Sequence, residues 1–204
     1  MGFLEDKFNE LYPNVGCELE YDNDPFHLLI AVMLSAQTTD KKVNIVTRVL
    51  FDRFKTIDDL INADVKSIEE IIRPLGIASV KSKRIKEISS ILKDKYGGIV
   101  PSKKEELVTL PGVGVKTANV VRVDYFKIPE FPVDTHVHRV SKRLGLIEEN
   151  DGVEKTEEVL RNTFSEENWG KLHHQFIHFG RYKCKAINPD CTGCPFKDMC
   201  TRNN

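Results

Sequence analysis

The sequence predicts an all-α protein, and three observations support that prediction. Its 204 residues are 40% hydrophobic and 30% charged, which is enough apolar material for one or two buried cores. Apolar residues recur at the three- and four-residue spacing of helices along most of the chain, and no segment shows the strict alternation of a half-buried strand. No apolar run approaches the roughly 18 residues of a membrane span.

Local signals mark where the helices begin and end. Pro25 can open a helix, because the amide that proline lacks would have no partner in the first turn. A Thr-Thr-Asp cluster ending at Asp40 can cap the next helix, and a glycine pair at Gly97 can end a later one. We expect helices over residues 3–11, 25–33, 41–54, 57–63, 67–75, 80–96, 103–110, 115–126, 135–144, 153–164 and 167–182.

Charge is unevenly distributed along the chain. The net charge of −1 argues weakly against nucleic acid as a partner, because Lys and Arg supply most of the affinity for phosphates. However, residues 81–104 carry eight basic side chains against two acidic ones, and residues 1–25 carry seven acids against one lysine. We expect a basic face and an acidic face, although a solvated helix face also explains the basic run. The N-terminus shows no signal-peptide pattern, so a cytoplasmic location is expected.

The most informative segment is LPGVGVKTA, which begins at Leu110 and lies between two helical patterns. Gly112 and Gly114 permit a tight turn whose amides are not obstructed by a Cβ atom, and Val113 can pack between the two helices. The next helix begins here with unpaired N–H groups, which suit a DNA phosphate. We therefore predict a phosphate-binding helix-hairpin-helix, with a purely structural corner as the alternative.

Two polar residues follow at chemically useful positions. Lys116 falls in the first turn of the second hairpin helix, where the positive end of the helix dipole favours a neutral, nucleophilic amine. Asp134 follows Pro132 and precedes an apolar helical pattern, which is typical of an N-cap. Taken singly, Lys116 could equally be a surface charge or a phosphate contact, and Asp134 a cap alone.

Four cysteines are clustered near the C-terminus with the spacing C-x6-C-x2-C-x5-C, namely Cys184, Cys191, Cys194 and Cys200. Four thiolates this close together can bind one tetrahedral metal ion or one cubane cluster, and the residues alone do not distinguish zinc from iron–sulfur. Disulfides are not expected without a secretion signal. Cys17 remains as a small buried residue.

Three segments together carry a resemblance: LLIAVMLSAQTTD, LPGVGVKTANVV and FPVDTHVHRVSKRLGL. They resemble the endonuclease III family of helix-hairpin-helix DNA glycosylases, and the similarity extends from about Pro25 to Cys200. The resemblance implies a bifunctional DNA glycosylase and abasic-site lyase acting on oxidised pyrimidines. It also implies that Lys116 attacks C1′ of the damaged nucleotide, that Asp134 assists, and that the four cysteines hold a [4Fe-4S] cluster.

The same resemblance implies residues that contact DNA. Gln37 matches a polar side chain that enters the space left by a flipped nucleotide, and Ile77 matches an apolar wedge. A loop amide and a core residue at a helix end are the respective alternatives. The other expected DNA contacts are Lys81 in the basic run, the hairpin residues Gly112, Val113 and Gly114, and Lys183 and Lys185 beside the cluster.

The resemblance further implies two helical domains with the active cleft between them. Residues 22–130 would form a six-helix barrel with the hairpin, and residues 1–21 with 131–204 would form the iron–sulfur cluster domain, so that Lys116 and Asp134 face each other. The expected partner is double-stranded DNA with damaged bases or abasic sites. The protein is expected to be a monomer, not bound to a membrane, and associated with the nucleoid.

Departures from the family pattern bear on specificity. Val115 stands where relatives often carry a basic residue, so one DNA contact is missing, and Arg122 and Asp124 are less apolar than expected. The mismatch-specific branches replace the nucleophilic lysine, which this chain retains at Lys116, and the chain lacks the second domain of the adenine-mismatch branch. The alternatives are a monofunctional mismatch glycosylase, which would activate water, and a non-catalytic DNA-binding module.

Overall fold

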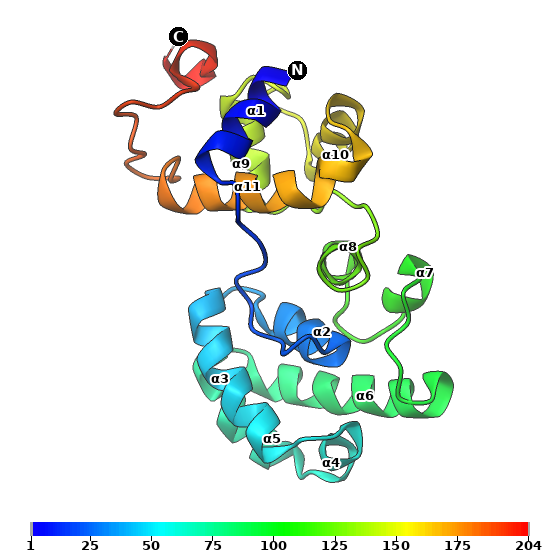
Figure 1. The fold of residues 1–204 in the computed structure, drawn as a ribbon. Coiled ribbons are helices and arrows are strands. Elements are labelled where there is room, and N and C mark those ends of the chain that lie inside the picture. Colours follow the sequence, from blue (N-terminus) through cyan, green and yellow to red (C-terminus); the bar gives the residue numbers. More distant parts are fainter. Residues whose placement is uncertain (1, 204) are drawn as a thin grey trace. The chain divides into compact units, whose positions relative to one another are not determined.

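The computed structural model describes residues 2–203, which fold into helices joined by turns (Figure 1). No β-strand occurs within this range, and the predicted all-α fold is confirmed. The chain divides into two compact units. One is Glu18–Phe126, called the hairpin unit below, and the other joins the segment ending at Cys17 to the segment beginning at Lys127, called the cysteine unit. None of the described helices is long and apolar enough to cross a membrane.

The hairpin unit is built around one buried helix. Its helices are α2 (Pro25–Leu34), α3 (Asp40–Arg53), α4 (Ile57–Asn62), α5 (Val65–Ile72), the short 3-10 helix η1 (Arg73–Leu75), α6 (Ala78–Tyr96), α7 (Lys104–Leu107) and α8 (Val115–Asp124). α4 and α5 pack against α6, α3 packs against α2 and α5, and α8 packs against α2 and α7. Every residue of α2 except Pro25 and His27 is buried, so α2 forms the centre of this core.

Side-chain caps explain where the first helices of the hairpin unit begin. Asp24 accepts hydrogen bonds from two first-turn amides of α2 at 2.7 and 3.2 Å, directly before Pro25. Thr39 caps α3, and Thr56 with Asp59 forms a reciprocal capping box at α4. Each cap satisfies amides that have no partner within the helix. The predicted helix starts at Pro25 and after the Thr-Thr-Asp cluster are confirmed.

The cysteine unit has an aromatic core. Its helices are α1 (Gly2–Leu11), α9 (Thr135–Arg143), α10 (Val153–Thr163), η2 (Glu166–Asn168), α11 (Trp169–Tyr182), η3 (Lys197–Met199) and η4 (Thr201–Asn203). α11 packs against both α1 and α9. Phe8 of α1 lies 4.5 Å from Phe176 and 4.9 Å from Phe196, measured between ring centroids. One ring therefore connects α1, α11 and the loop that contains the cysteines.

The helix predicted over residues 103–110 is wrong in length, because α7 ends at Leu107. Val108 is exposed, and Leu110 accepts a hydrogen bond from the amide of Val113 at 3.0 Å in a turn. Pro111 disfavours helical backbone at the residue before it. The apolar side chain of Leu110 is buried as the helical pattern requires, but it reaches the core from a turn.

The aromatic core predicts the effect of removing one ring. Phe176 is fully buried and contacts the rings of Phe8, Phe131 and Phe164. We expect Phe176→Ala to lower the free energy of unfolding by about 3–5 kcal/mol, because it leaves a cavity among rings that cannot close over it. Urea denaturation followed by circular dichroism measures this. Phe3→Ala is the control, since Phe3 is 53% exposed, and an equal loss in both variants would contradict the assignment of the core.

Candidate functional site

The hairpin connects α7 to α8 through a turn that contains two glycines. Val113 is buried, whereas Gly112 and Gly114 on either side of it are exposed. Gly114 is the N-cap of α8 and supplies no side-chain cap, so the first-turn amides are available to an external acceptor. The predicted arrangement of one buried valine between two open glycines is confirmed.

Gly112 is required by both its conformation and its surroundings. Its φ of 79° lies in the left-handed region that side chains other than glycine rarely adopt. A Cβ atom at this position would lie 2.7 Å from Cδ of Arg84, a residue of α6. Arg84 therefore lies directly against the turn and brings a guanidinium to the hairpin, a contact that periodicity in the sequence does not reveal.

Lys116 lies in the first turn of α8, and its side chain is exposed. The neighbouring Val115 is 56% exposed, so an apolar surface adjoins the lysine on its N-terminal side. An exposed amine beside uncapped backbone amides is an arrangement in which an amine can attack a substrate whose phosphate is bound by the turn.

Asp134 is the N-cap of α9, as predicted. Its Oδ1 atom accepts hydrogen bonds from the amides of His136 and Val137, both at 2.8 Å. These bonds hold the carboxylate in place and leave Oδ2 outside the cap. The helix itself is held against α11 at Gly180, where a Cβ atom would lie 3.0 Å from Cβ of His136.

Gln37 and Ile77 occupy two turns of the hairpin unit with the same unusual backbone conformation. Gln37 lies between α2 and α3 with a φ of 63°, and Ile77 lies between η1 and α6 with a φ of 51°. Left-handed backbone is uncommon for residues other than glycine and is rare for a β-branched one. Both side chains are exposed, Ile77 by 57%. The alternative of Ile77 as a core residue is therefore wrong.

Lys81 requires a correction, because it was expected to contact DNA and is instead 3% exposed. Its Nζ atom donates hydrogen bonds to the carbonyl oxygens of Leu34, Ala36 and Leu75 at 3.0, 3.0 and 3.3 Å. Burial lowers the pKa of this ammonium, and the nearby charge of Arg84 lowers it further. A buried cation held by three carbonyls does not reach a phosphate.

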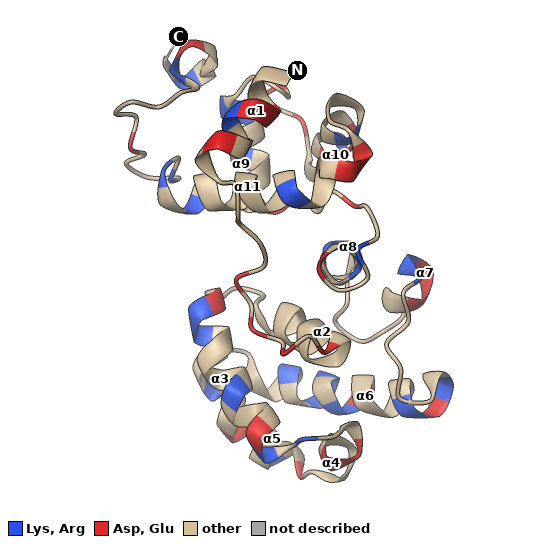
Figure 2. Cartoon of the chain, in the orientation of Figure 1, with Lys and Arg blue, Asp and Glu red and all other residues tan. Residues whose placement is uncertain are grey.

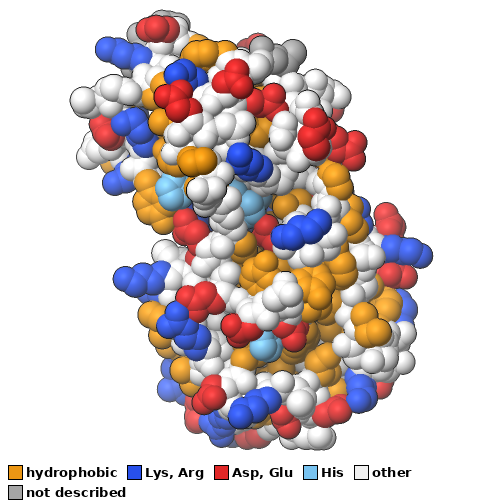
Figure 3. Space-filling view, in the orientation of Figure 1, with side chains coloured by type: hydrophobic (Ala, Val, Ile, Leu, Met, Phe, Trp, Pro, Cys, Tyr) orange, Lys and Arg blue, Asp and Glu red, His pale blue; other side chains and the backbone are white. Residues whose placement is uncertain are grey.

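The rest of the basic run also has internal partners. Lys86 donates to the carbonyl of Ala63, and Lys93 forms an ion pair with Asp58 at 2.9 Å. Figure 2 shows Lys and Arg spaced along the length of α6, and the face drawn in Figure 3 mixes both signs of charge. Lys86 and Lys93 thus contact other residues of the hairpin unit, and the expectation of one basic and one acidic face stays a prediction.

The four cysteines line one cavity that opens to solvent, together with Phe179 and Arg143. Burial raises the pKa of the Cys194 thiol, and the neighbouring Cys184 and Cys200 raise it further. Among residues 2–203, no three His, Cys, Asp or Glu side chains already form a compact metal-binding group. The four cysteines thus line one cavity, but their sulfur atoms are not gathered closely enough to form a metal-binding group.

Two arginines of α9 hold the cysteine loop by its backbone. Arg143 donates to the carbonyl and the sulfur of Cys184, both at 3.2 Å, and to the carbonyls of Lys185 and Ala186. Arg139 donates to the carbonyls of Gly180 and Cys184. Sequence reasoning missed both, because their carbonyl partners lie 41 to 45 residues further along the chain.

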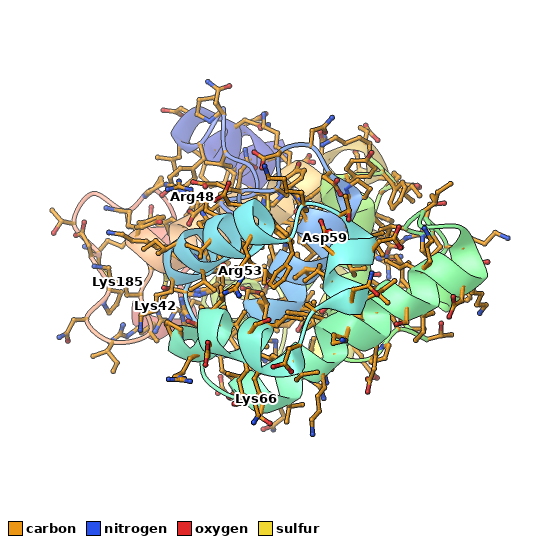
Figure 4. All side chains as sticks on the ribbon, turned by 90° about the horizontal axis from the view of Figure 1, so that it is seen from below. Lys42, Arg48, Arg53, Asp59, Lys66 and Lys185 are labelled. Carbon is orange, nitrogen blue, oxygen red and sulfur yellow. The ribbon has the colours of Figure 1, made fainter. Side chains whose placement is uncertain are left out.

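The two lysines expected to contact DNA from this loop differ in their surroundings. Lys183 donates to Asp190 at 3.1 Å and to the carbonyl of Thr192 at 3.0 Å, so it stabilises the loop. Lys185 is exposed and extends from the loop, as Figure 4 shows. Lys183 would have to give up its contacts with the loop in order to bind a phosphate. Lys185 would not.

The hairpin and the cysteine motif agree with known proteins. The family model for "HhH-GPD superfamily base excision DNA repair protein" matches residues 30–166. Endonuclease III of Bacillus subtilis (strain 168) is 44% identical over 97% of this chain and 90% of its own length. Endonuclease III of Thermotoga maritima is 42% identical over 88% of this chain and 84% of its own length. The chain belongs to the endonuclease III family.

Solved structures agree with that assignment. A non-covalent complex of endonuclease III with DNA superposes with a TM-score of 0.95 at 44% identity, covering 98% of this chain and 94% of the other. A trapped covalent endonuclease III–DNA intermediate superposes with a TM-score of 0.93, also at 44% identity, covering 97% and 92%. A thermostable thymine-DNA glycosylase, at 23% identity and a TM-score of 0.77, shares the fold.

The cap geometry of Asp134 predicts how two variants differ in stability. Asp134→Ala removes both cap bonds and should lower the free energy of unfolding by about 1 kcal/mol, whereas Asp134→Asn keeps an oxygen acceptor and should stay within about 0.5 kcal/mol of the parent. Thermal unfolding of the two variants measures the difference. Equal destabilisation of both would show that the negative charge, and not the cap, stabilises α9.

Proposed function

We propose that Lys116 is the nucleophile of a bifunctional DNA glycosylase and abasic-site lyase. The chain is a base excision repair enzyme of this class, like the endonuclease III proteins to which it is similar. The single observation that carries the proposal for Lys116 is its position: an exposed amine in the first turn of α8, two residues after the open Gly114 amide. The covalent DNA complex of a solved relative supports an enzyme-bound intermediate.

The chemistry divides one difficult substitution into easier steps. The Nζ lone pair of Lys116 forms a bond to C1′ of the damaged nucleotide, and the bond from C1′ to the base breaks, with the base leaving with the electron pair. Opening of the sugar ring gives a protonated Schiff base. Loss of a proton from C2′ then expels the 3′ phosphate by β-elimination. Hydrolysis of the Schiff base returns the free amine.

Asp134 is proposed to assist through its charge. Its carboxylate is held by two backbone amides, which orient it without a change in structure during the reaction. A fixed carboxylate stabilises the positive charge that develops on the sugar as the base leaves. It can also take a proton from the Lys116 ammonium before the attack, which frees the Nζ lone pair.

Double-stranded DNA with damaged bases or abasic sites is the proposed partner. The hairpin amides at Gly112 and Gly114 suit a phosphate, and Arg84 beside Gly112 adds a positive charge that Val115 does not supply. C1′ is inaccessible in a stacked duplex, so the nucleotide must be flipped out. The exposed Gln37 and Ile77 are the proposed side chains that fill the space it leaves.

Oxidised pyrimidines are the proposed lesions, a choice that rests on the family resemblance. We further propose that the hairpin unit corresponds to the barrel domain, expected over residues 22–130, and that the cysteine unit is the cluster domain. The protein is proposed to act as a cytoplasmic monomer at the nucleoid. Of the two lysines beside the cysteines, Lys185 is retained as a proposed phosphate contact, because Lys183 is held by Asp190.

A [4Fe-4S] cluster is the proposed occupant of the cysteine cavity. The fit rests on the donor set, since Cys184, Cys191, Cys194 and Cys200 all line one cavity and thiolates are the usual ligands of such clusters. When bound, the cluster would supply four metal–sulfur bonds that fix the loop. Arg143, which donates to the sulfur and carbonyl of Cys184, would orient this ligand.

Borohydride reduction tests the nucleophile. The protein incubated with duplex DNA containing an abasic site should form a covalent adduct on reduction, and Lys116→Gln should abolish the adduct while DNA affinity changes by less than about threefold. Lys171→Gln is a control at another exposed lysine. A persistent adduct in Lys116→Gln would reassign the nucleophile. If the parent releases the base from a duplex with an oxidised pyrimidine but forms no adduct there, the monofunctional alternative is favoured.

Metal analysis tests the cofactor. Purified protein should contain iron and inorganic sulfide in equal amounts and be coloured, and Cys194→Ser should lose both, because it removes one of four ligands. Cys17→Ser is the matched control, since Cys17 lies far along the chain from the motif. Stoichiometric zinc, or a colourless parent prepared without oxygen, would overturn the cluster assignment.

A further inference from the structure

The buried ammonium of Lys81 joins two turns of the hairpin unit that are distant in sequence. One carbonyl that it binds belongs to Ala36, which directly precedes Gln37, and another belongs to Leu75, two residues before Ile77. The third carbonyl belongs to Leu34, the last residue of α2. The amide of Lys81 also donates to the carbonyl of Ile77 at 3.1 Å. Both its backbone and its side chain therefore contact the Ile77 turn.

Both turns have backbone conformations that need external support. Gln37 and Ile77 each have a positive φ, and such a conformation in a residue other than glycine persists only where the surrounding contacts hold it. The two side chains are exposed, so packing of their own atoms does not supply that support. Lys81 donates hydrogen bonds to carbonyls beside both turns, whereas the backbone bond from the Thr38 amide to the Ser35 carbonyl is local to the Gln37 turn.

A buried cation is a costly way to join two turns. An ammonium removed from water must recover its hydration through hydrogen bonds, and an apolar side chain of similar length would fill the space without that cost. The ammonium adds directional hydrogen bonds, because its three N–H groups hold three main-chain oxygens in fixed positions around one nitrogen atom. Such a centre sets the positions of the two turns relative to each other.

We infer that Lys81 is a positioning residue that couples the Gln37 turn to the Ile77 turn, so that the two side chains enter the DNA stack together. The inference rests on the proposed function, in which these side chains fill the space left by a flipped nucleotide. It assigns Lys81 no contact with DNA. It explains instead why a lysine at the start of a basic helix points into the protein.

The first test compares a reaction on duplex DNA, in which side chains must fill the space left by the flipped nucleotide, with a reaction on single-stranded DNA, in which they need not. Lys81→Met should slow base release from a damaged duplex about tenfold in single-turnover kinetics, and leave cleavage of a single-stranded abasic oligonucleotide within about twofold. Lys66→Met, an exposed lysine on the neighbouring α5 (Figure 4), is the matched control and should change neither rate. Equal loss of both activities in Lys81→Met would indicate a general folding defect and overturn the inference, as would no loss of either.

A fluorescent base reports on the stack directly. With 2-aminopurine opposite a tetrahydrofuran abasic analogue, saturating parent protein should raise the fluorescence by displacing that base. Lys81→Met at saturation should give less than half of the increase, and Lys81→Arg, which keeps a cation and its donors, should recover part of it. Full fluorescence in Lys81→Met would contradict the coupling.

A double-variant cycle tests the coupling without altering Lys81, which matters if Lys81→Met does not fold. Gln37→Ala, Ile77→Ala and the double variant change only exposed side chains. If the turns act together, the double variant should release base about as slowly as the worse single variant, so the two effects do not multiply. Multiplying effects in the parent background would overturn the inference. A parent that cleaves no abasic substrate would instead refute the proposed function itself.

Discussion

The first turn of an α-helix has amide groups without hydrogen-bond partners inside the helix. The candidate site depends on how α8 and α9 each satisfy these amides. At α9 the Asp134 carboxylate accepts two of these amides, so the helix start is closed by its own side chain. At α8 the cap is Gly114, which offers no side chain, and the amides remain open to an anion. One helix start therefore fixes a carboxylate, and the other is open to an anion next to Lys116, where we propose that a phosphate binds.

Cations directed at main-chain carbonyls hold other irregular segments of the chain. Lys81 binds three carbonyls beside the Gln37 and Ile77 turns, and Arg139 with Arg143 binds the backbone of the cysteine loop. This use of positive charge further reduces the number of basic residues available for phosphates in a chain whose net charge is already −1. Several of its basic residues stabilise the irregular segments that present the site, and only some remain available for phosphates.

The sequence correctly predicted those features that depend on interactions between residues close together in the chain. The start of α2 at Pro25, the cap at Asp134 and the hairpin around Val113 each depend on residues within a few positions of one another. The fate of Lys81 could not be predicted in this way, because its partners lie six to 47 residues away and an exposed lysine has the same sequence pattern. The arginines that bind the cysteine loop were missed for the same reason.

The central claim is that the amine exposed beside the hairpin becomes covalently attached to the sugar, and peptide mapping tests it most directly. The borohydride-reduced adduct of the unaltered protein is digested with nuclease and trypsin and analysed by mass spectrometry. The account predicts a sugar remnant on a peptide spanning residues 105–122, uncleaved at Lys116 because the modified side chain is not recognised. A remnant on the N-terminal amine or on any other lysine, with cleavage after Lys116 intact, would contradict it.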